Sequence, residues 1–232
     1  MGTDDLHRKR RKERQKRLEE IRSIRASTWL IVSQGTETEP NYFNSFADFL
    51  NEHGKSEIEI KAIGIGKCPK GLVKKVEYFF EQVDREIGKV KIPYEKVCVV
   101  FDKDSFEPED FNTAIQMGEE RNYIVAWSNE CFELWFLQHF DYYHVQTGRE
   151  AYETKLTEIL TQKLGQPTKY DKADKKIFEY LMQYGSLKDA IKNANRLLDE
   201  FCDEKSHVKK SPATNVVKLI QRLMEEAGYD LE

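Results

Sequence analysis

The amino-acid sequence predicts an α/β fold, in which a parallel sheet flanked by helices is followed by a helical C-terminal region. Two observations support this prediction. Apolar strand patterns alternate with helical patterns from about residue 28 to residue 140, which is typical of a parallel sheet wrapped by helices. From about residue 147 onward the apolar periodicity is helical and no strand pattern is convincing.

The strands are predicted from β-branched runs and from alternation of apolar with polar residues. The run Val97–Phe101 is continuously apolar, as expected for a parallel strand buried on both faces. Residues 57–65 alternate instead, which fits a strand with one more polar face. The four predicted strands cover residues 28–34, 57–65, 97–102 and 123–127.

The helices are predicted from apolar residues at helical spacing and from their flanking residues. Pro40 suits the first turn of a helix, and Ser211 followed by Pro212 is interpreted as an N-cap and a first-turn proline. Four helices are predicted, one after each strand, at residues 41–51, 72–87, 108–121 and 130–140. Four more form the C-terminal region, at residues 149–164, 171–184, 187–203 and 212–227.

Charge is distributed unevenly along three predicted regions, which are a basic N-terminal arm (1–26), the α/β domain (27–146) and the helical region (147–232). Residues 1–25 contain ten Lys or Arg and five Asp or Glu, whereas the whole chain has a net charge of −4. A basic arm on an acidic body suggests an anionic partner, with nucleic acid as the leading candidate. Arg8, Arg10 and Arg11 are the predicted contacts, and the alternative is a solvated charged helix without a partner.

The charged residues, apolar runs and cysteines of the chain indicate which class of protein it belongs to. Charged residues make up 34% of the chain, and no apolar run approaches the roughly 20 residues that span a bilayer, so we expect no membrane partner. The four cysteines are scattered and form no Cys-x-x-Cys pair, which favours reduced thiols in a cytoplasmic protein.

Two acids directly follow the most apolar predicted strand. Asp102 and Asp104 are two residues apart, so on a strand their side chains point to the same side. The carboxyl edge of an open α/β sheet is where ligands bind, and two converging carboxylates repel each other unless a cation or a shared proton lies between them. Mg²⁺ suits such a pair. The alternative is a turn and helix-cap pair, because Asp is common in turns.

Four ordered motifs resemble the RloB family of bacterial proteins associated with restriction and phage-defence loci. They are Gln34-Gly35-x-x-x-Glu39-Pro40-x-Tyr42-Phe43, Phe101-Asp102-x-Asp104, Ser128-Asn129-x-Cys131-Phe132-Glu133-x-Trp135-x-x-x-His139-Phe140 and Ser211-Pro212-x-Thr214-x-Val216. The resemblance extends from about residue 28 to residue 222. It implies a Toprim-type fold, in which a strand-tip acid and an Asp-x-Asp pair use Mg²⁺ or Mn²⁺ for phosphoryl transfer.

The sequence departs from the Toprim pattern at the first strand tip, where the acid is replaced by Gln34. A carboxamide neither gives nor takes a proton at neutral pH. Three explanations remain open. Glu37 or Glu39 supplies the acid from the turn, the site binds without cleaving, or Gln34 is an inactivating substitution. The motif position of Glu133 suggests a third acid near the metal or a structural hydrogen-bond acceptor.

Two lysine pairs are candidates for phosphate contacts. Lys67 and Lys70 flank a Gly/Pro loop after the second strand, and Lys209 and Lys210 precede Ser211. A solvated loop and an ordinary helix start are the respective alternatives.

Two functions of different classes follow from the sequence. The first is a Mg²⁺-dependent nuclease acting on RNA, tRNA included, or on DNA in anti-phage defence. The second is a non-catalytic nucleic-acid sensor or assembly subunit, with Gln34 marking lost chemistry. Both are compatible with a homo-oligomer and with a partner protein from a defence locus.

Overall fold

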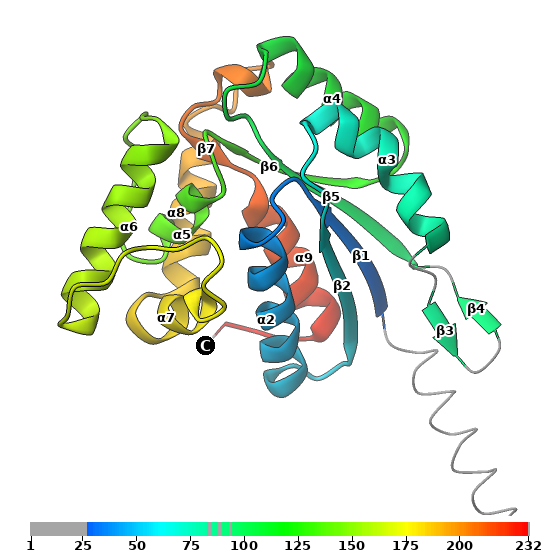
Figure 1. Ribbon diagram of the computed structural model, residues 1–232, viewed down its shortest axis with the longest axis horizontal. Coiled ribbons are helices and arrows are strands. Elements are labelled where there is room, and N and C mark those ends of the chain that lie inside the picture. Colours follow the sequence, from blue (N-terminus) through cyan, green and yellow to red (C-terminus); the bar gives the residue numbers. More distant parts are fainter. Residues whose placement is uncertain (1–26, 83–84, 88–89, 93, 232) are drawn as a thin grey trace, which may run out of the picture.

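A five-stranded sheet forms the centre of the molecule in the computed structural model, which describes residues 27–82, 85–87, 90–92 and 94–231. The order is β2-β1-β5-β6-β7, and the first four strands are parallel (Figure 1). The strands are β1 (Ser27–Ser33), β2 (Ile58–Gly64), β5 (Lys96–Asp102), β6 (Ile124–Asn129) and β7 (Ala213–Thr214). The predicted mixed α/β class is therefore confirmed.

The central strands are buried on both faces because their alternate side chains enter two different cores. On β1, Trp29 and Ile31 belong to one core, whereas Leu30 and Val32 belong to the other. The same division places Cys98 and Val100 of β5 in the first core. A continuous apolar strand needs such cover on both sides.

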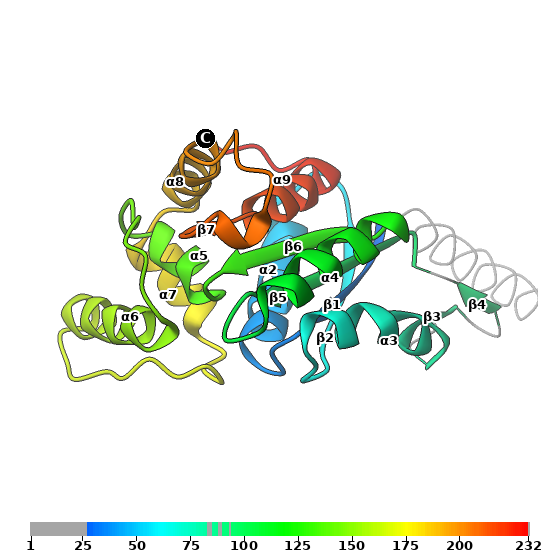
Figure 2. The ribbon, with the colours of Figure 1, turned by 90° about the horizontal axis from the view of Figure 1, so that it is seen from above.

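Helices provide that cover on each face of the sheet (Figures 1 and 2). Helices α3 (Pro69–Gln82) and α4 (Pro108–Glu120) lie on one face, where Phe111 packs with the second core. Helices α2 (Thr38–His53) and α9 (Val216–Ala227) lie on the opposite face with the first core.

The helical region extends the first core past the carboxyl ends of the strands. It contains α5 (Glu133–Gln138), α6 (Arg149–Leu164), α7 (Ile177–Tyr184) and α8 (Leu187–Asp199). The ring of Tyr42 on α2 lies 5.7 Å from that of Phe132, 5.6 Å from that of Phe136 and 5.5 Å from that of Phe178. This aromatic packing fixes the helical region against the edge of the sheet that carries the acids.

One local prediction after the second strand was wrong. The helix predicted at residues 72–87 begins earlier and ends at Gln82. Residues 85–92 contain instead a two-stranded antiparallel pair, β3 (Arg85–Ile87) and β4 (Val90–Ile92). The apolar residues there are spaced closely enough to fit either period, so the sequence alone was ambiguous.

The interpretation of Ser211 and Pro212 as a helix start was also wrong. The chain is extended after Pro212, where β7 pairs antiparallel with β6, and α9 begins only at Val216. The Asn215 side chain explains the delay, because it accepts a hydrogen bond from the Trp127 amide and donates one to the Val125 carbonyl. A strand therefore exists beyond residue 147, contrary to the prediction.

Two predictions remain, one on membrane spans and one on the N-terminal arm. None of the helices in the described residues is both long enough and apolar enough to cross a membrane. The predicted basic arm, with Arg8, Arg10 and Arg11, lies outside the described residues.

Candidate functional site

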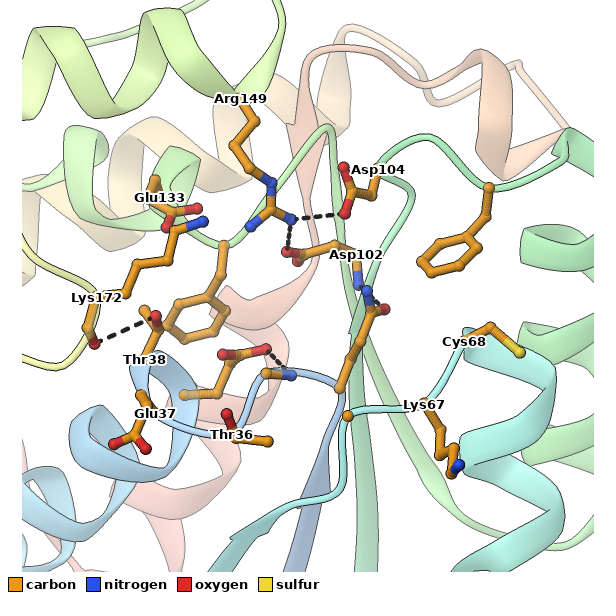
Figure 3. A pocket seen from close by; sticks show the side chains of 16 residues that line it. Thr36, Glu37, Thr38, Lys67, Cys68, Asp102, Asp104, Glu133, Arg149 and Lys172 are labelled. Atoms are coloured by element: carbon orange, nitrogen blue, oxygen red, sulfur yellow. Dashed lines mark hydrogen bonds and ion pairs between the residues drawn. The ribbon is translucent and has the colours of Figure 1, made fainter.

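A pocket of about 490 Å³ lies at the carboxyl ends of β1 and β5. Its wall is formed by the segment after β1, the loop after β2, the tip of β5 and the first residues of α5 and α6 (Figure 3). The pocket therefore lies where sheet topology places ligands in α/β folds, and it brings together side chains from distant parts of the chain.

Asp102 and Asp104 converge in this pocket as predicted, but through a turn after the strand and not through the strand alternation on which the prediction was based. Asp102 ends β5 and is 4% exposed, and the next amide, that of Lys103, donates to the Ser128 carbonyl. Asp104 follows with a φ of 45°, a left-handed conformation that Asp tolerates better than most residues. Its amide donates to the Glu130 carbonyl, which holds the turn in place.

Arg149 joins the two aspartates, and sequence reasoning did not identify it. Its Nη2 atom donates to Asp102 Oδ2 at 2.9 Å and to Asp104 Oδ2 at 3.1 Å (Figure 3). Arg149 is the first residue of α6, 45 positions after Asp104. No local signal distinguishes it from the other basic residues of a charged helix, because its partners are set by tertiary packing.

Glu39 and Glu37 both line the pocket from the turn after β1, but only Glu39 is buried there. Glu39 is 3% exposed, and its Oε1 accepts a hydrogen bond from the Gly35 amide at 2.9 Å. A Cβ atom at Gly35 would lie 2.1 Å from Glu39 Oε2, so the Glu39 carboxylate can occupy this position only if residue 35 is glycine. Glu37 is exposed and points away from the two aspartates (Figure 3).

Gln34 occupies the tip of β1 and faces β5. Its side-chain Oε1 accepts a hydrogen bond from the backbone amide of Asp102 at 3.2 Å, and the backbone amide of Gln34 donates to the Val100 carbonyl. A carboxylate oxygen could accept the same bond from Asp102, so the position accommodates either side chain. The side-chain oxygen thus links the two strand tips without providing a titrating group.

Glu133 lies at the start of α5 and is 1% exposed. Tyr170 donates its hydroxyl hydrogen to Glu133 Oε1 at 3.1 Å, whereas Oε2 is buried and has no hydrogen-bond partner in the described residues. This acid is therefore half satisfied, which is uncommon for a buried carboxylate. His139, on the same stretch of chain, is buried and contacts the Trp135 carbonyl through Nδ1, which is a structural arrangement.

The buried acids of the pocket share an excess of negative charge. The pKa of Glu39 is raised to about 7, mainly by burial, with the charge of Glu133 adding to the rise and the hydrogen bond from the Gly35 amide opposing it. Burial also raises the pKa of Asp102 well above its usual range, with Glu39 adding to the shift. Burial opposes the charge of Arg149, but the carboxylates, Asp102 foremost, raise its pKa overall.

The comparison with known families identifies the chain. It matches the family described as RloB-like protein over residues 29–223. The chain belongs to the RloB-like family. No curated protein and no solved structure matches it.

Two aspartates of this RloB-like chain have the donor chemistry for a divalent cation. Asp102 Oδ1 is buried and lacks a hydrogen-bond partner, so one oxygen of the pair is available. Across the described ranges, no three His, Cys, Asp or Glu side chains lie close enough together to hold one ion. Mg²⁺ and Mn²⁺ do not require a third protein ligand, since Mg²⁺ is often bound by one or two carboxylates and water. Glu39 accepts a hydrogen bond from the Gly35 amide through Oε1, and its role as a further ligand stays a prediction.

The predicted phosphate-binding lysines of the RloB-like chain separate into three groups. Lys67 lines the pocket, as does Lys172, which the sequence did not single out and which also pairs with Glu153 at 2.7 Å. Lys70 is directed to α4, where its Nζ lies 2.7 Å from Asp110 Oδ1. Lys209 and Lys210 lie at the short 3₁₀ turn His207–Lys209, which packs near α4, and they do not line the pocket.

Proposed function

We propose that this RloB-like protein is a divalent-cation-dependent nuclease with a Toprim-type site, acting in the cytoplasm in bacterial anti-phage defence. The observation that carries the proposal is the convergence of Asp102 and Asp104 at the carboxyl edge of a parallel sheet, with a third acid, Glu39, buried beside them. The family membership adds the restriction and phage-defence context described for RloB proteins. The substrate is a phosphodiester of RNA, tRNA included, or of DNA.

The residues of the pocket have complementary roles in this proposal. Asp102 and Asp104 hold Mg²⁺ or Mn²⁺, which supplies charge neutralisation at the scissile phosphate and a more acidic water. Glu39 is the acid with a pKa of about 7, close to the value that suits a general acid or base at neutral pH. Lys67 and Lys172 line the same pocket and suit the phosphate backbone.

A second candidate is a non-catalytic sensor or assembly subunit that binds nucleic acid through the same pocket. The observation that favours it is Gln34, whose carboxamide occupies the strand tip and bonds to the Asp102 amide. In this alternative the protein works with a partner protein or a second copy of itself, and the pocket serves only for binding.

One set of variants distinguishes the two candidates. We would incubate the parent protein, Gln34→Glu and Asp102→Ala with mixed tRNA, single-stranded RNA and duplex DNA, in Mg²⁺ or Mn²⁺ and then in EDTA. We expect cleavage by the parent that EDTA abolishes and that Asp102→Ala lowers by at least 100-fold. Cleavage by Gln34→Glu alone would identify a disabled nuclease. Nucleic-acid binding that survives Asp102→Ala, with no cleavage by any form, would favour the sensor.

A further inference from the structure

Arg149 neutralises the aspartate pair in an arrangement that leaves polar atoms unsatisfied. Within the described residues, the ion pairs of Asp102 and Asp104 are both made to this one side chain, through the single nitrogen Nη2. An arginine that binds a carboxylate well uses two parallel N–H bonds. Here Arg149 Nε and Asp102 Oδ1 are instead buried without hydrogen-bond partners.

The position of Arg149 allows it to turn toward the pocket. It begins α6 directly after Gly148, which is extended, and the Arg149 side chain keeps 26% of its surface exposed. The pocket that it lines also contains Lys67 and Lys172, so an anion there would meet cations from three separate segments of the chain (Figure 3). A guanidinium binds phosphate with two parallel hydrogen bonds, which its present contact does not provide.

A divalent cation and the Arg149 guanidinium compete for the aspartate pair in this geometry. The guanidinium nitrogen lies 2.9 Å and 3.1 Å from one oxygen of each carboxylate. A Mg²⁺ ion bound by these oxygens, or by the unpartnered Oδ1 of Asp102, would lie about 2.0–2.1 Å from its ligands. It would therefore stand within a few ångströms of the guanidinium, where two positive charges in a half-buried site repel strongly.

We propose that Arg149 is a displaceable internal counter-ion, which competes with the divalent cation for Asp102 and Asp104 and is withdrawn by a nucleic-acid phosphate entering the pocket. This proposal rests on the proposed metal function of the two aspartates. It makes metal binding and nucleic-acid binding mutually reinforcing through one side chain, since a ligand that removes the competitor must raise the affinity for the metal. A protein built this way stays metal-poor until nucleic acid arrives.

The first test measures Mn²⁺ affinity by isothermal titration calorimetry, without nucleic acid. We expect Arg149→Gln to bind Mn²⁺ at least tenfold more tightly than the parent, and Arg149→Lys to lie between them because it keeps a charge without the guanidinium. Lys155→Gln is the matched control, since it removes an exposed cation from the same helix, where Lys155 pairs with Glu158, and we expect it to leave the Mn²⁺ affinity unchanged. Circular dichroism verifies that each variant is folded.

The second test adds a single-stranded phosphorothioate oligonucleotide of 12 thymidines, whose linkages resist hydrolysis. We expect it to raise the Mn²⁺ affinity of the parent severalfold more than that of Arg149→Gln, in which only direct contact between phosphate and metal can contribute. We also expect Arg149→Gln to bind the oligonucleotide more weakly in Mn²⁺ than the parent does. The opposite signs of the two effects distinguish a counter-ion from a residue that only braces the aspartates.

The outcomes separate this proposal from the nuclease proposal. If Arg149→Gln binds Mn²⁺ no more tightly than the parent, the counter-ion role is overturned, while metal binding by the parent still supports the proposed function. If neither form binds Mn²⁺, the proposed function fails and the counter-ion role fails with it. Loss of Mn²⁺ binding in Asp102→Asn, combined with a gain in Arg149→Gln, supports both.

Discussion

The two ends of the same sheet differ in how their charged side chains are paired. At the amino end, Lys96 of β5 pairs one to one with Glu226 of α9 and lies over the Trp29 ring, and both charged side chains are one-third exposed. At the carboxyl end, four acids meet one arginine: Glu39 and Glu133 are almost fully buried beside the pair Asp102 and Asp104. The amino end is organised as ordinary structure, whereas the carboxyl end retains charge that the fold does not neutralise.

The difference indicates where the protein is arranged for a ligand rather than for stability. Unpaired buried polar atoms cost free energy, and a protein without a use for them tends to lose them. Of the buried side-chain atoms without a hydrogen-bond partner in the described residues, the three that belong to acids or to arginine are Asp102 Oδ1, Glu133 Oε2 and Arg149 Nε, and all three lie at the carboxyl end. Three experiments on stability sharpen the comparison between the two ends.

The largest expected effect is a pH dependence that originates at Glu39. Its pKa is about 7 in the folded protein, above the usual value, so the folded state holds the proton more tightly than the unfolded chain. The contribution of Glu39 to stability should therefore be highest at low pH and fall as the pH rises toward 7, by up to about 3 kcal/mol in total. Urea unfolding in EDTA, at intervals from pH 4.5 to pH 8, measures this slope.

Glu39→Gln is the variant that isolates this effect, because glutamine can still accept the bond from the Gly35 amide. His139 acts in the opposite direction over part of this range, since burial lowers its pKa to about 4 and acid therefore favours the unfolded chain. The difference between the parent and Glu39→Gln removes the histidine contribution. A difference that stays constant from pH 4.5 to pH 8 would show that Glu39 titrates normally.

The next effect concerns the half-satisfied acid Glu133. Tyr170→Phe removes the hydroxyl that donates to Glu133 Oε1 and leaves both oxygens of a buried carboxylate without a partner. We expect a loss of about 2 kcal/mol in the free energy of unfolding at neutral pH, measured in urea.

Tyr152→Phe is the matched control for that experiment. Tyr152 is also fully buried, but its hydroxyl donates to the main-chain carbonyl of Val145. Removing this hydroxyl therefore takes a donor from a neutral carbonyl and not from a carboxylate. We expect a smaller cost of about 1 kcal/mol. Equal costs for the two variants would contradict the view that the Tyr170 hydroxyl has a special role as the donor to Glu133.

The smallest effect is expected at the amino end. Glu226→Gln breaks the ion pair with Lys96, in which both side chains are one-third exposed. Water screens such pairs, so the free energy of unfolding should fall by less than about 1 kcal/mol, and addition of salt should narrow the difference. A larger loss would contradict the view that the amino end contributes only ordinary surface pairing.

The sequence by itself determined the main strands, most helices and the location of the aspartate pair. Alternation and apolar runs report burial directly, so β1, β2, β5 and β6 follow from local patterns, which also place Asp102 at a strand tip with Asp104 in the turn that follows. Helix α6 begins and ends where its periodicity predicted. These features depend on residues close together in the chain.

Only the tertiary structure decided which charges meet. It joined Arg149 to the aspartates, directed Lys70 to Asp110 and selected Glu39 over Glu37 as the buried acid. It also made residues 213–214 a strand, because β6 offers an open edge there. The physical reason is common to these cases, because each contact joins residues through packing or strand pairing that no local periodicity encodes.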